Sequence, residues 1–70
     1  MGMSWNYRVV KKDGMYAIHE VYYSDGKVVG ITEDGVAPTG ETKLEVVEDL
    51  VRMLQDCKSE VVDYEDFASK

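Results

Sequence analysis

The chain has 70 residues, a length that allows one domain built around one hydrophobic core. Hydrophobic residues make up 44% of it and include five tyrosines and one tryptophan, which argues against a disordered chain. No apolar run approaches the roughly 18 residues of a membrane helix, so we expect no contact with a membrane. The net charge of −6 disfavours direct binding of nucleic acid, whose phosphates are also negative, and is compatible with a basic protein partner.

The single cysteine, Cys57, cannot form an internal disulfide. The start of the chain also shows no signal-peptide pattern. Together these features predict a cytoplasmic protein with a reduced thiol. A domain of this size without a disulfide is marginally stable, and it therefore needs a well-packed core or a partner.

Three stretches rich in aromatic and β-branched residues predict the strands of a small antiparallel sheet. The middle stretch, Met15 to Tyr23, is the densest in such residues. Asp13-Gly14 and Asp25-Gly26 separate the stretches, and Asp-Gly is a pair that supplies positive φ in a two-residue hairpin turn. The strands therefore form a meander, and they cover residues 5–11, 15–23 and 27–32.

Two-residue turns also fix which residues lie opposite one another. A slip of one residue in either turn would exchange the two faces of one strand. The predicted pairs are Trp5–Tyr22, Tyr7–Glu20 and Val9–Ile18 across the first turn, and Tyr22–Val29 and Glu20–Ile31 across the second.

Side chains of a strand alternate between two faces of the sheet. The first face is the predicted core, and the second face is mixed in character. The first face carries Trp5, Tyr7, Val9, Tyr16, Ile18, Tyr22, Val29 and Ile31, with Glu20 as its acidic member. The second face carries Asn6, Arg8, Val10, Ala17, His19, Val21, Tyr23, Val28, Gly30 and Thr32.

A helix is predicted from Thr42 to about Cys57 or Lys58, after a loop over residues 33–41. Thr42 and Glu45 have the spacing of a capping box at its start. Apolar residues then recur at helical spacing and predict a face that packs across the sheet. These residues are Leu44, Val47, Leu50, Val51 and Leu54.

The predicted fold is α+β in the order β-β-β-α-β. It combines a three-stranded antiparallel meander, one helix packed on one face, and a short fourth edge strand at Val61 to Tyr64. The fourth strand would run parallel to the first and lie beside it. We expect a single domain over residues 1–70, with an ordered core over about residues 5–64 and an acidic tail over 65–70.

This order, a tight hairpin followed by a capped helix laid on the sheet, resembles the HicB-type antitoxin domain over about residues 5–64. Proteins of that family bind and block a small basic ribonuclease, so the resemblance implies a basic protein partner. The family's Pro-Asp-Leu-Pro-Gly region is absent here, where His19 to Lys27 reads H-E-V-Y-Y-S-D-G-K. The stretches W-N-Y-R-V-V, A-I-H-E-V-Y-Y, D-G-K and V-V-D-Y-E-D-F more closely resemble a family of small uncharacterised bacterial proteins, which implies a bacterial origin.

His19 and Glu20 are the obvious pair for acid–base chemistry, but adjacent strand residues point to opposite faces, so a dyad would need a bulge. A carboxylate of Glu20 in the core would need a partner such as a tyrosine hydroxyl, or its pKa would rise. One histidine and one cysteine are too few for a typical metal site, and the phosphate-loop pattern does not occur. We therefore predict no catalytic residue, no cofactor and no metal site.

The second face has no predicted helix to cover it, and exposed apolar patches often mark interaction sites. We therefore predict a non-enzymatic interaction or regulatory module, antitoxin-like in its narrowest form, that forms a homodimer or binds a basic protein. Two alternatives stay open. The tail could fold over this face, or the chain could be a small-molecule-binding protein or minor enzyme that uses Glu20, His19 and nearby tyrosines. The predicted interaction surface consists of Val10, Ala17, His19, Val21, Tyr23 and Val28.

Overall fold

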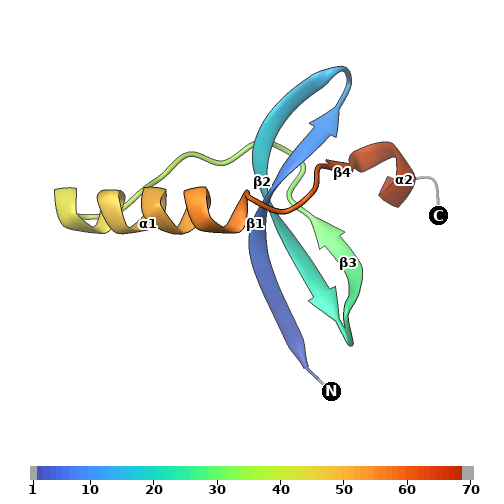
Figure 1. The fold of residues 1–70 in the computed structure, drawn as a ribbon, viewed down its shortest axis with the longest axis horizontal. Helices are drawn as coiled ribbons and strands as arrows, with labels where there is room; N and C mark the ends of the chain where they lie inside the picture. Colours follow the sequence, from blue (N-terminus) through green and yellow to red (C-terminus); the bar gives the residue numbers. More distant parts are fainter. Residues whose placement is uncertain (1, 69–70) are drawn as a thin grey trace.

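The computed structural model describes residues 2–68, which form one four-stranded sheet and two helices (Figure 1). The strands lie in the order β3-β2-β1-β4, and β4 runs parallel to β1 at the edge of the sheet. The predicted α+β fold, with its meander and its fourth strand beside the first, is therefore confirmed. The elements are β1 (Met3–Lys12), β2 (Met15–Ser24), β3 (Lys27–Ile31), α1 (Lys43–Asp56), β4 (Val62–Asp63) and α2 (Tyr64–Ala68).

The hairpin of β1 and β2 has the predicted register. Asp13 and Gly14 both have positive φ, 53° and 76°, as a two-residue turn of this kind requires. Tyr7 lies opposite Glu20 and Trp5 lies opposite Tyr22. The predicted assignment of β1 and β2 residues to the two faces of the sheet is therefore confirmed.

The predicted pairing of β2 with β3 is wrong beyond the turn. Val28 lies opposite Tyr23 as a two-residue turn dictates, but the register then shifts, and Gly30, not Val29, lies opposite Tyr22. Val29 is therefore the extra residue of a β-bulge. As a result, Ile31 pairs with Val21 instead of Glu20 and moves to the second face.

The most deeply buried strand residues lie mainly on the second face, contrary to the prediction that the first face is the core. Val10 and Val21 have no exposed surface and His19 is buried, whereas Tyr7 is the buried residue of the first face. The C-terminal segment covers this side. Arg8 donates a hydrogen bond from Nε to the carbonyl oxygen of Glu60, and Figure 1 shows α2 on the side of the β1–β2 hairpin away from α1.

The predicted acidic tail begins with a helical turn. Tyr64 to Ala68 form α2, and the Tyr64 and Phe67 rings pack edge to face with their centroids 6.0 Å apart. Lys12 Nζ lies 4.5 Å from the centroid of the Tyr64 ring, which fixes the segment against β1. The first tail residues thus lie beside β1, whereas Ala17 and Val28 of the second face stay exposed; residues 69–70 lie outside the described part of the chain.

The bounds of α1 agree with the prediction. Thr42 is the N-cap, and its hydroxyl accepts a hydrogen bond from the Glu45 amide at 3.2 Å. The Glu45 carboxylate accepts from the amide of Glu41 rather than from that of Thr42, so the capping box is displaced by one residue. The helix ends at Asp56 with Cys57 as its C-cap.

The orientation of α1 differs from the prediction. Figure 1 shows the helix meeting the sheet near its C-terminal end and projecting away from it, so it does not lie across the strands. Consistent with this extended arrangement, the radius of gyration is 12.6 Å, against about 11 Å for a compact chain of this length.

Candidate functional site

The apolar side of α1 is exposed along the helix. Its five residues were predicted to pack on the sheet, yet each is between 44% and 66% exposed. We define this apolar face as Leu44, Val47, Leu50, Val51 and Leu54.

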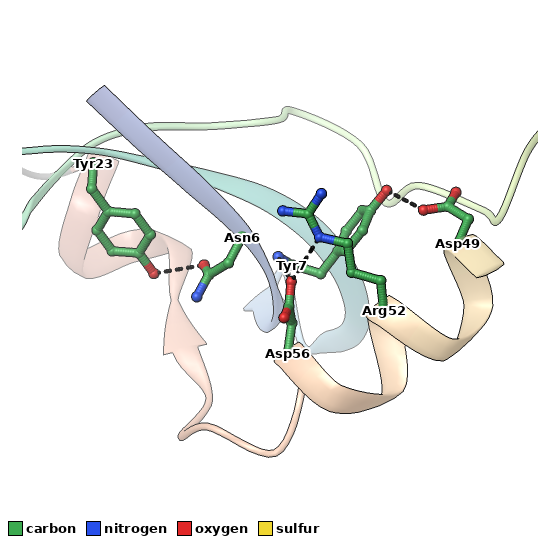
Figure 2. A network of polar contacts seen from close by, with 6 residues as sticks. All are labelled: Asn6, Tyr7, Tyr23, Asp49, Arg52 and Asp56. Carbon is green, nitrogen blue, oxygen red and sulfur yellow. Dashed lines mark hydrogen bonds and ion pairs between the residues drawn. The ribbon is translucent and has the colours of Figure 1, made fainter. Parts of the chain in front are cut away.

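The opposite, polar face of α1 attaches the helix to β1. The hydroxyl of Tyr7 donates a hydrogen bond to Asp49 Oδ1 at 2.6 Å, and the backbone amide of Tyr7 donates to Asp56 Oδ2 at 3.1 Å. Figure 2 shows both carboxylates directed toward Tyr7. Because residues two apart on a helix point in nearly opposite directions, the side of α1 that carries Asp49 cannot also carry Val51.

Arg52 and Met53 complete this attachment. The Arg52 guanidinium lies over the Trp5 ring, 4.0 Å from its centroid, and Nε of Arg52 lies 3.4 Å from Asp56 Oδ2. A cation above an aromatic face is attracted by the ring quadrupole. Met53 is the buried residue of α1, with 1% of its surface exposed.

The pair of Tyr7 and Asp49 is fixed in one protonation state at neutral pH. Burial, followed by the hydrogen bond to the Asp49 carboxylate, raises the pKa of Tyr7 to about 12. The hydrogen bonds from the Tyr7 hydroxyl and the Thr39 amide lower the pKa of Asp49. A neutral phenol thus donates to an ionised carboxylate, which is the stronger class of hydrogen bond.

The loop before α1 holds the same face of the helix. The Thr39 amide donates to Asp49 Oδ2 at 3.1 Å, so both oxygens of that carboxylate are occupied. Gly40 lies so close to the helix that a Cβ there would clash with Glu45 Cβ. Earlier in the loop, the Val36 amide donates to the carbonyl of Ile18 at 2.8 Å. The loop and β1 together occupy the polar face and leave the apolar face open.

The interaction surface predicted from the sequence is largely closed. Val10, His19 and Val21 are buried and therefore cannot contact a partner. The Tyr23 hydroxyl donates to Asn6 Oδ1 at 2.9 Å and accepts from Arg8 Nη1 at 3.0 Å, on the side of β1 away from α1 (Figure 2). Ala17 and Val28 are the members of the set that remain exposed.

His19 and Glu20 do not converge. Nδ1 of His19 lies 2.8 Å from the carbonyl oxygen of Thr32, so the ring fastens the end of β3 to β2. The Glu20 carboxylate accepts a hydrogen bond from the Tyr22 hydroxyl, as predicted for an inward carboxylate, and this contact raises the pKa of Tyr22. Both side chains thus have structural partners.

A hollow of about 670 Å³ lies between the start of β3 and the C-terminal segment, and neither His19 nor Glu20 lines it. Among the described residues, no group of three or more His, Cys, Asp or Glu side chains is placed to hold a metal ion. No helix within residues 2–68 is long and apolar enough to cross a membrane. The residues that line the hollow are Lys27, Val28, Val61, Val62, Asp63, Asp66 and Phe67.

Sequence reasoning identified the apolar face but missed its orientation. The sequence analysis assigned no role to Asp49, Arg52 or Asp56, which contact the sheet. Their spacing of three and four residues makes a second continuous face on α1. That spacing could have indicated that the polar side of α1 contacts the sheet. A second signal was that a buried tyrosine hydroxyl needs a hydrogen-bond acceptor.

Comparisons of this chain with protein-family models, with curated proteins and with solved structures found no match.

Proposed function

We propose that this chain is a non-enzymatic protein-interaction module and that the apolar face of α1 is its binding surface. The observation that carries the proposal is the attachment of α1 through its polar face, which leaves five aliphatic side chains in solvent. Contiguous exposed apolar surface of this kind is typical of protein–protein contact sites. The apolar residues of α1 recur every three or four positions, and amphipathic helices with this spacing bind to hydrophobic grooves and to other helices.

The rigid setting of the helix also supports binding. Its N-terminus is capped by Thr42, and its polar side is bonded to β1 and to the preceding loop. A helix that is already formed and oriented loses less conformational entropy on binding than one that must fold first. Net charge −6 adds a general attraction to basic partners, which fits the antitoxin-like form of the proposal.

Site-directed photo-crosslinking in cells that express the chain tests the proposal. A photoreactive phenylalanine derivative replaces Leu50 on the apolar face, and in a control protein it replaces Met15, which is 71% exposed in the β1–β2 hairpin. We expect a protein adduct from position 50 and none from position 15. Absence of an adduct at position 50, or equal adducts at both positions, would contradict the proposal.

A further inference from the structure

We infer that the hollow between the start of β3 and the C-terminal segment is a binding site for a short zwitterionic peptide with apolar side chains. The hollow is separate from the apolar face of α1, because no residue of that helix lines it. The inference therefore goes beyond the proposed function and names a second site.

The hollow forms where the two edges of the sheet curl toward each other. β3 and β4 are separated by two strands in the order β3-β2-β1-β4, yet residues from both line the same space. Val28 of β3 pairs with Tyr23, and Val62 of β4 pairs with Val10. Paired residues share one face of a sheet, so the hollow lies over the second face, where Figure 1 shows β3 and α2 on the side of the hairpin away from α1.

The size and lining of the hollow are those of a small-ligand site. Its volume of about 670 Å³ falls within the range of about 300–1,000 Å³ that is usual for ligand pockets. Such pockets combine apolar walls with a few polar groups that fix the orientation of the ligand. The apolar walls here are the side chains of Val28, Val61, Val62 and Phe67.

Two opposite charges line the hollow from its two sides. Lys27 lies at the start of β3 and Asp66 lies in α2, and both are exposed. Within residues 2–68, neither the Lys27 ammonium nor the Asp66 carboxylate has a hydrogen-bond or ion-pair partner. Asp63 adds a second carboxylate on the side of Asp66, and one of its oxygens accepts from the Glu65 amide at 2.9 Å. A ligand that complements these walls carries a cation at one end and an anion at the other.

A short peptide has this distribution of charge. Its free ammonium would bind Asp66, its free carboxylate would bind Lys27, and apolar side chains would contact the walls between them. A single amino acid carries both charged groups on one carbon atom, whereas each added residue separates them by up to about 3.5 Å. Charges on opposite sides of the hollow therefore favour a peptide of two or three residues over a free amino acid.

The wall formed by the C-terminal segment is already fixed in place. Arg8 Nε donates to the carbonyl oxygen of Glu60 at 3.2 Å, and Lys12 Nζ lies 4.5 Å from the centroid of the Tyr64 ring. The Phe67 ring packs on that of Tyr64 with 6.0 Å between the centroids. A site whose walls are already ordered loses little conformational entropy when a ligand binds.

The test is a titration of the isotope-labelled full chain with trileucine, followed through the amide signals in nuclear magnetic resonance spectra. We expect saturable shifts at Val28, Val62 and Phe67. Asp66→Asn and Lys27→Met should each raise the Kd about two- to fivefold, as expected for exposed ion pairs. The matched controls Glu48→Gln and Lys43→Met remove exposed charges on α1 and should leave the Kd unchanged.

Modified peptides assign each end of the ligand. N-acetylated trileucine should bind wild type and Asp66→Asn equally, and trileucine amide should bind wild type and Lys27→Met equally, because each lacks the group that the altered side chain would contact. Triglycine carries both charges without apolar side chains and should give no saturable shifts.

Three results would overturn the inference. These are no saturable shift with millimolar trileucine, shifts centred on α1 instead of the hollow, and tighter binding of trileucine amide than of trileucine, which would indicate a simple cation site. Leu50→Glu should leave trileucine binding unchanged. The peptide titration and the crosslinking from position 50 can therefore fail independently, so failure of this inference is distinguishable from failure of the proposed function.

Discussion

The β1–β2 hairpin and α1 are held in the molecule in different ways. The hairpin pairs without interruption from Met3–Ser24 to Lys12–Met15, and it supplies the fully buried Val10 and Val21. The helix buries one apolar side chain, Met53, and is otherwise fixed by polar contacts. The sheet therefore carries the hydrophobic core, while α1 is a helix presented by that core with its own apolar side facing solvent.

The largest effect that distinguishes these regions should come from Met53→Ala. Removing most of a buried methionine side chain leaves a cavity between α1 and β1 and should lower the free energy of unfolding by about 2–5 kcal/mol. Urea denaturation followed by circular dichroism measures the loss. The neighbouring variant Leu54→Ala is the control, at concentrations where the chain is monomeric; an equal loss in both variants would show that α1 packs through its apolar face after all.

Tyr7→Phe should have the next largest effect, because it removes the hydrogen bond that joins β1 to Asp49. The pKa of Tyr7 is raised to about 12 in the folded chain, so its contribution to stability is present below pH 10 and is lost as the pH rises toward 12. Tyrosinate absorbance, followed during an alkaline titration, should lack in this variant the ionisation step that occurs at the highest pH in the wild type. Retention of that step would assign it to another tyrosine, such as Tyr22.

The same contact predicts a loss of stability in acid. Because the folded chain lowers the pKa of Asp49, its contribution is present at neutral pH and is lost as the pH falls below about 4. Stability measured from pH 7 to pH 3 should decrease less in Asp49→Asn than in the wild type. A parallel decrease in the two proteins would contradict the role of this carboxylate.

Thr42→Ala should destabilise the chain by about 1 kcal/mol, because the N-cap hydroxyl no longer accepts from the Glu45 amide. The control is Thr39→Ala, since the amide of Thr39 and not its hydroxyl bonds to Asp49. Thermal unfolding of both variants provides the comparison, and a Thr39→Ala loss as large as that of Thr42→Ala would argue against the capping role.

Leu44→Gln should have the smallest effect on the single chain. Its side chain is 65% exposed, and exposed substitutions usually change stability by at most about 0.5 kcal/mol. Denaturation at a concentration where the chain is monomeric measures this value. A loss of several kcal/mol would mean that Leu44 is buried in the folded monomer.

The hairpin could be predicted from the sequence because its geometry is local. Asp13-Gly14 fixes a two-residue turn, and the turn fixes every pair of β1 and β2. The second turn was equally predictable, but the bulge at Val29 was not, because nothing in a turn dictates an extra residue farther along the strand. Gly30 was the available signal, since a glycine inside a strand often marks a bulge.

The ends of α1 could also be predicted, whereas its partner could not. Periodicity shows which side of a helix is apolar, but it does not say whether the chain's own sheet or another molecule covers that side. The structure settles the orientation through Asp49 and Asp56, whose bonds to Tyr7 connect residues more than 40 positions apart. Such distant pairings depend on the whole fold and leave little trace in local sequence.

Nuclear Overhauser spectroscopy on a chain with labelled methyl groups is the most direct test of the orientation of α1. The account predicts contacts from the Met53 methyl group to β1, because this side chain is buried. It predicts no contacts within one chain from the methyl groups of Leu50 and Val51 to the rings of Tyr16 and Tyr22 on the first face of the sheet. Strong contacts within one chain to those rings would show that the apolar face covers its own sheet and would contradict the account.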